Sequence, residues 1–594
     1  MPLYTGNSKR SAMPEPLGPI PVSGSAEAGD RLDSWKEIAA YLGREVRTVQ
    51  GWEKLEGLPI HRHLHSRQGS VYAFKTEMDA WREARKGVSE GPMPVLVQEA
   101  PAAGPDRYRT PLILTACAVT ALAILGGWLW MKRPAKSPGT ALSSVVVLPF
   151  LDLSPQKDQE YFSDGLTEEI IDALSRVPDL RVVARTSAFA FKGKANDIRQ
   201  IGQQLNVSAV LEGSVRKAGD QLRITAQLNR VSDGTHLWSR TFDRQLRDVF
   251  GVQLDISQAI ADQLRAGRVP QREPTTNLEA YNRFQEGRYF FNQGRPDSLL
   301  KAQERYQRAI ENDPKFALAY AGLADTYAYQ AEHMMAAPRQ VMPKAKESAE
   351  KAVSLNDSLG EAHTSLGIVK LDYEWDRDGA QREFLRAMQL NPGSGYLHHW
   401  YAHSLEAQGR LDDALREMRA ALALDPLAVI IHWDIANELL MAHRYDDALR
   451  QLERSLELFP NHPLLLYFEG WAYHAKNDPA SAHRVMETLR AALSGSPDQP
   501  FSQAVFGIEE AWDGRRADAE RTLRQLENLR ATQYVDAMVV AFLCSALGDR
   551  DGLRLWFQRA YDERETLFVY APIMRGIYFS GGDPQVESLI AKLR

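Results

Sequence analysis

A spacing of 34 residues recurs through the second half of the chain. Pro392, Pro426 and Pro460 lie 34 residues apart, and Ala414 and Ala448 share the same spacing. Small residues allow two helices to cross closely, and a proline interrupts the helix between one unit and the next. The period therefore predicts a series of helix pairs, each packed on its neighbours, and it excludes a single compact core for this part of the chain.

A period of 34 with small residues inside each helix pair is the tetratricopeptide signature. The unit 395–428 places Tyr401, Ala402 and Met418 at the expected offsets. We predict an all-α tetratricopeptide solenoid over residues 277–594, with about eight units, some of them degenerate. Such a solenoid is expected to bind a protein or peptide partner.

Five side chains resemble positions that line the groove of tetratricopeptide folds. They are candidates for peptide contact, although an ordinary surface role remains an alternative: Tyr396, His399, His403, Trp433 and Asn437. The two histidines stand one helical turn apart and could together chelate a metal ion. Peptide contact is the preferred interpretation, so the sequence leads us to expect no metal site and no cofactor.

Residues 142–268 switch between helical and strand periods, which predicts a two-layer α/β domain. The segments "VVVLPFLDLS", "YFSDGLTEEIIDALSRVPDLRVVARTSAFAFKGK" and "VLEGSVRKAGDQLRITAQL" resemble the amino-terminal domain of TolB and its relatives. That resemblance spans about 120 residues. Asp164, Glu168 and Glu169 form an acidic stretch that we interpret as a favourable helix start and not as catalytic residues.

Residues 31–86 predict a small winged helix-turn-helix domain. Ser34 and Glu37 form a capping box that opens a first helix, and Gly43 ends it before a second helix. A hairpin follows, and a third helix starts at Thr76. This domain holds eleven Lys and Arg against eight Asp and Glu, although the whole chain has a net charge of −6. Any DNA-binding surface must therefore be local.

Three histidines, His61, His63 and His65, alternate along one predicted strand and share one of its faces. They suggest either zinc or the wing of a DNA-binding module. No cysteine lies close in sequence to complete a tetrahedral site, so the wing is the preferred interpretation.

The stretch "SWKEIAAYLGREVRTVQGWEKLEGLPIHRH" and the following "GSVYAFKTEMDAW" resemble the winged helix-turn-helix of the MerR/excisionase class. This resemblance implies that DNA is bound by Arg47, Thr48, Gln50 and Lys54 in the groove and by Arg62 and Arg67 on the wing. The long dimerisation helix of MerR proteins is not visible here, so the resemblance does not predict how a homodimer would form.

Residues 111–131 include "PLILTACAVTALAILGGWLW", an uncharged apolar stretch long enough for a transmembrane helix. A buried helix of a soluble core is the alternative. A linker over 87–110 precedes it, and residues 1–30 are expected to be a disordered tail. Basic residues flank the stretch on both sides, so the charges alone do not set its orientation.

The order of domains resembles CadC-like one-component regulators in layout. It implies a single-pass protein of the inner bacterial membrane, with a cytoplasmic DNA-binding head and periplasmic C-terminal domains. Our main hypothesis is a membrane-anchored transcriptional regulator whose outer domains sense a signal or bind a protein. The alternative is a membrane-tethered tetratricopeptide scaffold. The motifs GxxxxGK[ST], GxGxxG, HExxH and GxSxG are absent, so we do not expect an enzyme.

Overall fold

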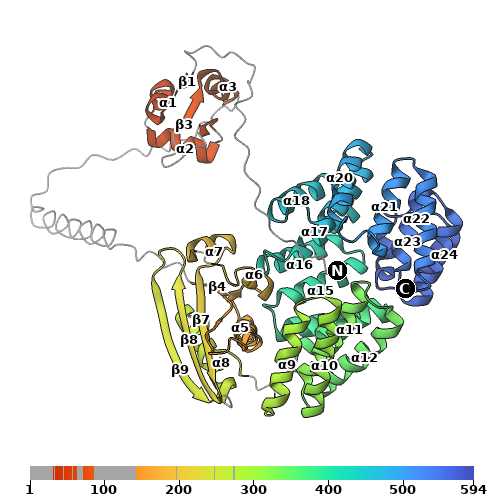
Figure 1. Cartoon of the computed structure of the whole chain (residues 1–594). Coiled ribbons are helices and arrows are strands. Elements are labelled where there is room, and N and C mark those ends of the chain that lie inside the picture. Colours follow the sequence, from red (N-terminus) through yellow and green to blue (C-terminus); the bar gives the residue numbers. More distant parts are fainter. Residues whose placement is uncertain are drawn as a thin grey trace, which may run out of the picture. The chain divides into compact units, whose positions relative to one another are not determined.

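The computed structural model describes most of the chain, as two compact units treated separately below (Figure 1). The described residues are 31–32, 34–44, 46–56, 58–62, 71–85, 142–194, 197–245, 248–271 and 275–593. The predicted tail over 1–30, the linker over 87–110 and the apolar stretch over 111–131 all lie outside them. Within the described ranges, no helix has both the length and the apolar character that crossing a membrane requires.

The described residues of the first unit form three helices and three short strands. In chain order its elements are β1 (Arg31–Leu32), α1 (Trp35–Leu42), α2 (Val46–Glu56), β2 (His61–Arg62), β3 (Val71–Phe74) and α3 (Lys75–Arg85). The strands pair antiparallel in the order β1-β3-β2. Ser34 caps α1 by accepting the backbone N–H of Glu37, and Gly43 ends this helix with a φ of 64° that favours glycine.

The core of this unit forms where its three helices meet the sheet. Ile38 of α1, Val49 of α2 and Met78 of α3 are fully buried, and Trp52 packs against Trp81. The predicted turn of the hairpin near residues 67–69 falls outside the described residues.

The second unit begins with an α/β domain. Its elements are β4 (Ser144–Val147), β5 (Leu151–Asp152), α5 (Glu160–Ser175), β6 (Arg181–Val182), α6 (Arg185–Phe189), α7 (Ile198–Gln204), β7 (Ala209–Ala218), β8 (Gln221–Arg230), β9 (His236–Gln245) and α8 (Val249–Leu264). The strand order is β6-β4-β7-β8-β9, with β5 also paired to β7. Strands β4, β5 and β6 run parallel to their partners, whereas β7, β8 and β9 form an antiparallel meander.

This sheet has one covered face and one open face. Along β8, Leu222 and Ile224 are buried, while Arg223 between them is exposed and pairs with Asp243 of β9. Helices α5 and α8 pack together and cover the buried face. Alternation of this kind is what a sheet with helices on a single face requires.

Sixteen helices in eight antiparallel pairs make up the solenoid (Figure 1). They are α9 (Leu278–Phe291), α10 (Pro296–Asn312), α11 (Ala317–Glu332), α12 (Pro338–Leu355), α13 (Gly360–Val369), α14 (Arg377–Leu390), α15 (Gly395–Ala407), α16 (Leu411–Leu424), α17 (Val429–Met441), α18 (Tyr445–Leu458), α19 (Pro463–Ala475), α20 (Pro479–Ala492), α21 (Pro500–Trp512), α22 (Arg516–Leu529), α23 (Ala537–Leu547) and α24 (Arg550–Glu563). A short π-helix, η2 (Lys370–Glu374), extends α13. Close packing explains the small residues: a Cβ added at Gly367 of α13 would lie 2.6 Å from the ring of Phe384 of α14.

The chain does not continue as helix pairs after Glu563. It forms short elements instead: η3 (Thr566–Tyr570), α25 (Ala571–Met574), α26 (Pro584–Ile590) and η4 (Ala591–Leu593). We call residues 566–593 the C-terminal segment. It folds back on earlier repeats, where the side chain of Arg377 donates to the carbonyl of Val569 and the hydroxyl of Tyr578 donates to Asn437.

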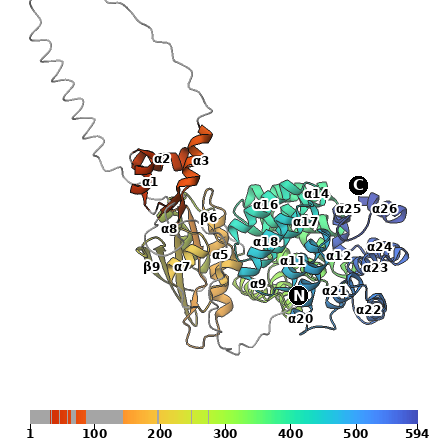
Figure 2. The ribbon, with the colours of Figure 1, turned by 90° about the horizontal axis from the view of Figure 1, so that it is seen from above.

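The α/β domain and the solenoid meet at a junction between α5 and α9 (Figure 2). Arg288 of α9 lies 2.6 Å from Glu168 and 2.7 Å from Glu169, both on α5. Helix α5 begins at Glu160, so these acids lie two turns inside it and not at its start. Our interpretation of them as a helix start is wrong, because their carboxylates instead pair with arginines of other elements.

Candidate functional site

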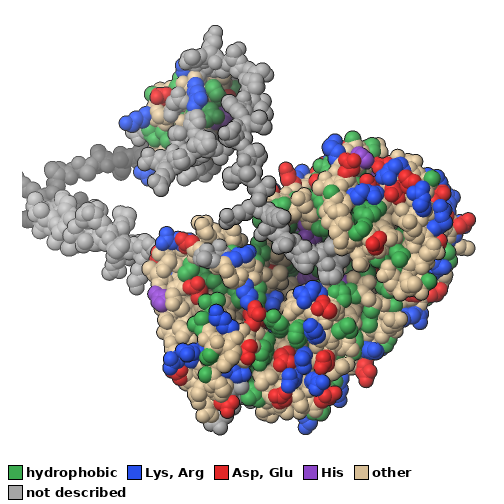
Figure 3. Space-filling view, in the orientation of Figure 1, with side chains coloured by type: hydrophobic (Ala, Val, Ile, Leu, Met, Phe, Trp, Pro, Cys, Tyr) green, Lys and Arg blue, Asp and Glu red, His purple; other side chains and the backbone are tan. Residues whose placement is uncertain are grey.

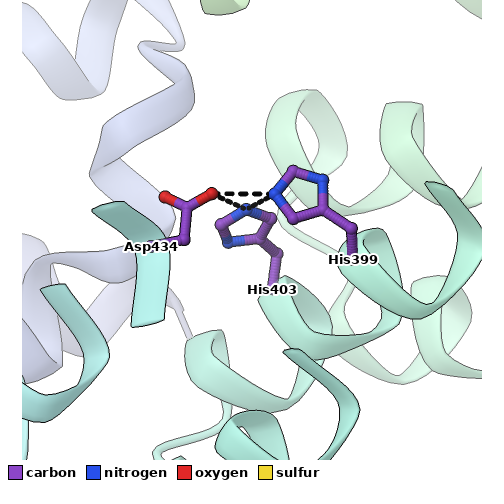
Figure 4. Close-up of side chains that lie close together, drawn as sticks. All are labelled: His399, His403 and Asp434. Carbon is purple, nitrogen blue, oxygen red and sulfur yellow. Dashed lines mark hydrogen bonds and ion pairs between the residues drawn. The ribbon is translucent and has the colours of Figure 1, made fainter. Parts of the chain in front are cut away.

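In the middle of the solenoid, the first helices of two adjacent pairs, α15 and α17, carry a cluster of histidines and acids. Nε2 of His399 lies 2.8 Å from Oδ2 of Asp434 and 3.3 Å from Nε2 of His403. Nε2 of His403 lies 3.7 Å from the same oxygen of Asp434. Figure 4 shows both imidazoles of α15 and the carboxylate of α17 pointing toward one another. Three ligand atoms therefore converge on one point.

A second carboxylate fixes the orientation of one imidazole. Nδ1 of His403 lies 2.9 Å from Oε2 of Glu406, one turn further along α15. A carboxylate at this distance accepts the Nδ1 proton and leaves Nε2 free to face His399 and Asp434. Glu406 is buried, so this contact is shielded from water.

Glu438 is a buried acid without a hydrogen-bond partner among the described residues. It follows Asp434 by one turn on α17, its exposed fraction is 0%, and neither of its carboxylate oxygens makes a hydrogen bond with any residue that the structure describes. Burial raises the pKa of Glu438 well above its usual range, and repulsion from Glu406 adds to this effect. A buried polar group left without a partner costs stability, so its presence calls for an explanation.

More carboxyl groups surround the cluster. Burial raises the pKa of Asp372 in η2 to about 7. Burial likewise raises the pKa of Glu332 in α11, and the charge of Asp372 adds to the shift. With Glu406, Asp434 and Glu438, five acidic side chains thus accompany two histidines. Figure 3 shows histidine side chains in a hollow on this face of the solenoid.

His403 and Asp434 hold opposite charges in the absence of a ligand. Burial alone would raise the pKa of Asp434, but hydrogen bonds from His399 and His403 outweigh burial and hold this pKa at about 2. Burial would lower the pKa of His403, yet Asp434 and Glu406 raise it well above its usual range. Burial lowers the pKa of His399. Protons and a cation therefore compete for the same three atoms.

The structure brings together only part of the predicted groove. His399 and His403 meet in the cluster, and Tyr396, one turn earlier on α15, is 48% exposed beside Trp400. Trp433 is half-buried and stacks on His462. Asn437 already accepts a hydrogen bond from Tyr578 of the C-terminal segment.

Sequence reasoning missed Asp434, Glu438 and Glu406. Asp434 follows His399 by 35 residues, and Glu438 follows His403 by 35. This spacing is one repeat plus one residue, so matching positions of adjacent repeats would have placed the acids beside the histidines.

The predicted DNA contacts of the first unit are only partly described. Arg47 and Thr48 are exposed on α2, and Gln50 is half-buried. The side chains of Lys54 and Arg62, and the whole of Arg67, lie outside the described residues, as do His63 and His65. Of the three predicted histidines, His61 is described, and its Nε2 lies 2.7 Å from Oε2 of Glu77 in α3.

Comparison with protein families identifies tetratricopeptide repeats in the C-terminal region. Two family models described as "Tetratricopeptide repeat" match residues 401–437 and 439–499. The first covers the second half of α15, the loop after it, α16 and most of α17, and so includes His403 and Asp434. The prediction of tetratricopeptide repeats is confirmed for these residues.

A curated relative corrects one of our expectations. The chain is 39% identical over 214 residues to a protein of Rhizobium meliloti (strain 1021) named "Putative adenylate cyclase 3". This match covers 33% of the chain and 36% of the relative, so the chain spans about a third of that protein. We expected no enzyme from the absence of catalytic motifs. That expectation is contradicted by a relative that carries the name of an enzyme.

Solved structures that align with part of this chain include human IFIT1 as a dimer with m7Gppp-AAAA, at 15% identity and a TM-score of 0.39, covering 58% of this chain and 75% of that one. YrrB, titled a TPR protein with an unusual peptide-binding site, matches at 21% identity and a TM-score of 0.25, covering 33% and 93%. PilW, a type IV pilus biogenesis factor, matches at 18% identity and a TM-score of 0.31, covering 36% and 92%. Similarity at this level carries no argument about ligands.

Proposed function

We propose that this chain is an interaction protein whose solenoid binds a partner protein through the first helices of its repeats. This is the scaffold alternative from the sequence, and the tetratricopeptide matches support it over a DNA-binding regulator. One observation carries the proposal. Tyr396 exposes 48% of its surface on a helix whose other side chains are buried or half-buried.

The chemistry around Tyr396 indicates which segment a partner presents. The carboxyl groups of Asp325, Glu332 and Asp372 lie close enough to act on this tyrosine electrostatically. An exposed aromatic ring provides a large contact area at low entropic cost, and a bound cation would favour the ionised form of these three carboxyl groups, whose pKa values burial raises. The preferred partner segment therefore carries Lys or Arg next to an apolar residue.

A displayed peptide library, selected on the full-length chain, tests this proposal. We expect selected peptides to be rich in Lys and Arg, and Tyr396→Ala to weaken their binding by about tenfold or more. The matched control is Leu300→Ala, which removes a side chain that is 63% exposed on α10, the second helix of its pair. Equal loss in both variants, or no enrichment of basic residues, rejects the proposal.

DNA binding by the first unit is a second candidate function. It is favoured by α2, where Arg47 and Thr48 are exposed while Val49 beside them is fully buried. This arrangement leaves one face of the helix available for the major groove. Arg47→Ala is expected to cost roughly 1–3 kcal/mol on a selected site and to relax sequence choice. Arg82→Ala on α3 is the control, and an equal effect of the two variants contradicts the assignment.

The enzymatic name of the curated relative identifies no catalytic residues in this chain, so it is tested by an activity assay. Adenylate cyclase activity of the purified full-length chain is measured directly, as formation of cyclic AMP from ATP. Activity above the rate of a heat-denatured sample supports a function shared with the relative, and its absence means that this chain does not share the activity that the name implies.

A further inference from the structure

The cluster between α15 and α17 has the composition of a metal site. Each helix contributes two ligand-type side chains one turn apart, His399 and His403 on α15 and Asp434 and Glu438 on α17. Imidazole nitrogens with carboxylate oxygens suit zinc and other divalent transition metals, whereas magnesium and calcium prefer oxygen alone.

The distances within the cluster fit a metal ion. The separations of 2.8, 3.3 and 3.7 Å among Nε2 of His399, Nε2 of His403 and Oδ2 of Asp434 define a circle with a radius of about 1.9 Å. Zinc binds such atoms at about 2.0–2.2 Å, so it fits slightly above their plane. Three corners of a tetrahedron have this geometry, and the fourth direction remains for another ligand.

Without a metal ion, hydrogen bonds do not give a partner to each of the three atoms that face one another, Nε2 of His399, Nε2 of His403 and Oδ2 of Asp434. A proton on Nε2 of His399 serves the contact with Asp434, while the proton on Nδ1 of His403 is directed to Glu406. When His403 is neutral, its Nε2 then faces His399 with a lone pair and no donor, and when His403 carries a second proton, that proton occupies the position that a cation would take. A cation at the centre accepts lone pairs from all three atoms at once.

Glu438 is the second, independent observation. Its carboxylate is fully buried without a hydrogen-bond partner among the described residues, and it acts electrostatically on His403 and Asp434. Glu406 contacts Nδ1 of His403, the ring nitrogen that does not face the site. A carboxylate in this position orients a metal-bound histidine and raises its basicity.

We propose that His399, His403 and Asp434 bind one divalent transition-metal ion, with Glu438 beside it and Glu406 orienting His403. The side chain of His403 is 17% exposed, which leaves a route for the ion. The bound ion links the first helices of two adjacent repeats and neutralises the acidic centre of the solenoid. This inference stands apart from partner binding, since each can fail without the other.

Zinc titration of the full-length chain, purified without a polyhistidine tag and stripped by a chelator, tests this proposal. Zinc is added in competition with a chromophoric chelator, and bound metal is counted by mass spectrometry. We expect about one tight zinc per chain, lost in the double variant His399→Ala/His403→Ala. His398→Ala is the matched control, because His398 lies on the same helix and pairs with Glu417 instead. It should keep the zinc.

Two further variants make the outcome decisive. Glu406→Gln should weaken zinc binding by roughly 10–100-fold at unchanged helicity, as expected for a positioning residue. If the double variant fails to fold, Asp434→Asn replaces it, and retained affinity there overturns the proposal. Loss of zinc binding in the variant His483→Ala also overturns the proposal, because His483, Glu509 and Asp513 form the other candidate metal-binding group among the described residues.

Discussion

The junction between α5 and α9 and the cluster between α15 and α17 both bury acids, but cationic side chains pair with Glu168 at the junction, whereas no described residue hydrogen-bonds to Glu438 in the cluster. At the junction, Glu168 receives Arg185 and Arg288 at 2.6 Å each, and Asn292 at 3.0 Å. In the cluster, Glu438 receives nothing from the described residues. A buried acid with internal cations holds the fold together, whereas a buried acid without them marks a place for a cation from outside.

The largest effect is expected from breaking the junction. Arg288→Ala leaves Glu168, Glu169 and Asp172 without their shared cation, and removing one partner of a buried ion pair costs about 3–5 kcal/mol. Urea unfolding of the full-length chain measures this change. The control is Arg223→Ala on the open face of the sheet, whose pair with Asp243 is exposed and should contribute nothing measurable.

Removing a buried acid from the cluster should instead raise the stability of the metal-free protein. Glu438→Met replaces an unpartnered buried carboxyl by an apolar side chain of similar size, which should stabilise the metal-free protein by roughly 1–3 kcal/mol. Thermal unfolding in the presence of a chelator measures this gain. A loss of stability on this substitution would show that Glu438 has a partner and would remove the contrast between the two regions.

Buried acids with and without a cationic partner among the described residues should also differ in pH dependence. Burial would raise the pKa of Glu168, but Arg288 and Arg185 lower it, so its contribution is present above its unfolded pKa and is lost only as the pH falls through its lowered folded pKa. Burial raises the pKa of Asp325, which accepts a hydrogen bond from Ser365, from 3.8 to about 7. The contribution of Asp325 is therefore full below about pH 4 and is lost as the pH rises through about 7.

Asp325→Asn isolates this second effect. Relative to the wild type, the variant should gain stability on the order of 2 kcal/mol between pH 5 and pH 8, because it no longer loses a proton in that interval. Urea midpoints at the two pH values measure the difference. A constant difference across the interval contradicts the raised pKa of Asp325.

The smallest effect concerns the C-terminal segment. Tyr578→Phe removes the hydroxyl that donates to Asn437 at 2.7 Å, which should cost about 1 kcal/mol. Hydrogen exchange should rise in residues 566–593 and stay constant at the junction. Equal changes in both places would show that the segment does not respond on its own.

The sequence predicted the repeated helix pairs because prolines and small residues recur at a fixed period, and it predicted His399 and His403 as neighbours because they share one helix. It did not place Asp434 beside them, since the pairing of adjacent repeats is shifted by one residue from the period. The partners Glu168 and Arg288 are 120 residues apart in different domains, and no local pattern links them. The C-terminal segment has no period, so nothing indicated that it folds back.

Anomalous X-ray diffraction from crystals of the full-length chain grown with zinc tests the contrast between the two regions most directly. The account predicts an anomalous peak about 2.0–2.2 Å from the Nε2 atoms of His399 and His403 and from Oδ2 of Asp434, and none at the junction of Glu168 and Arg288. A zinc-free cluster in such crystals, or a peak only at His483, Glu509 and Asp513, would contradict it.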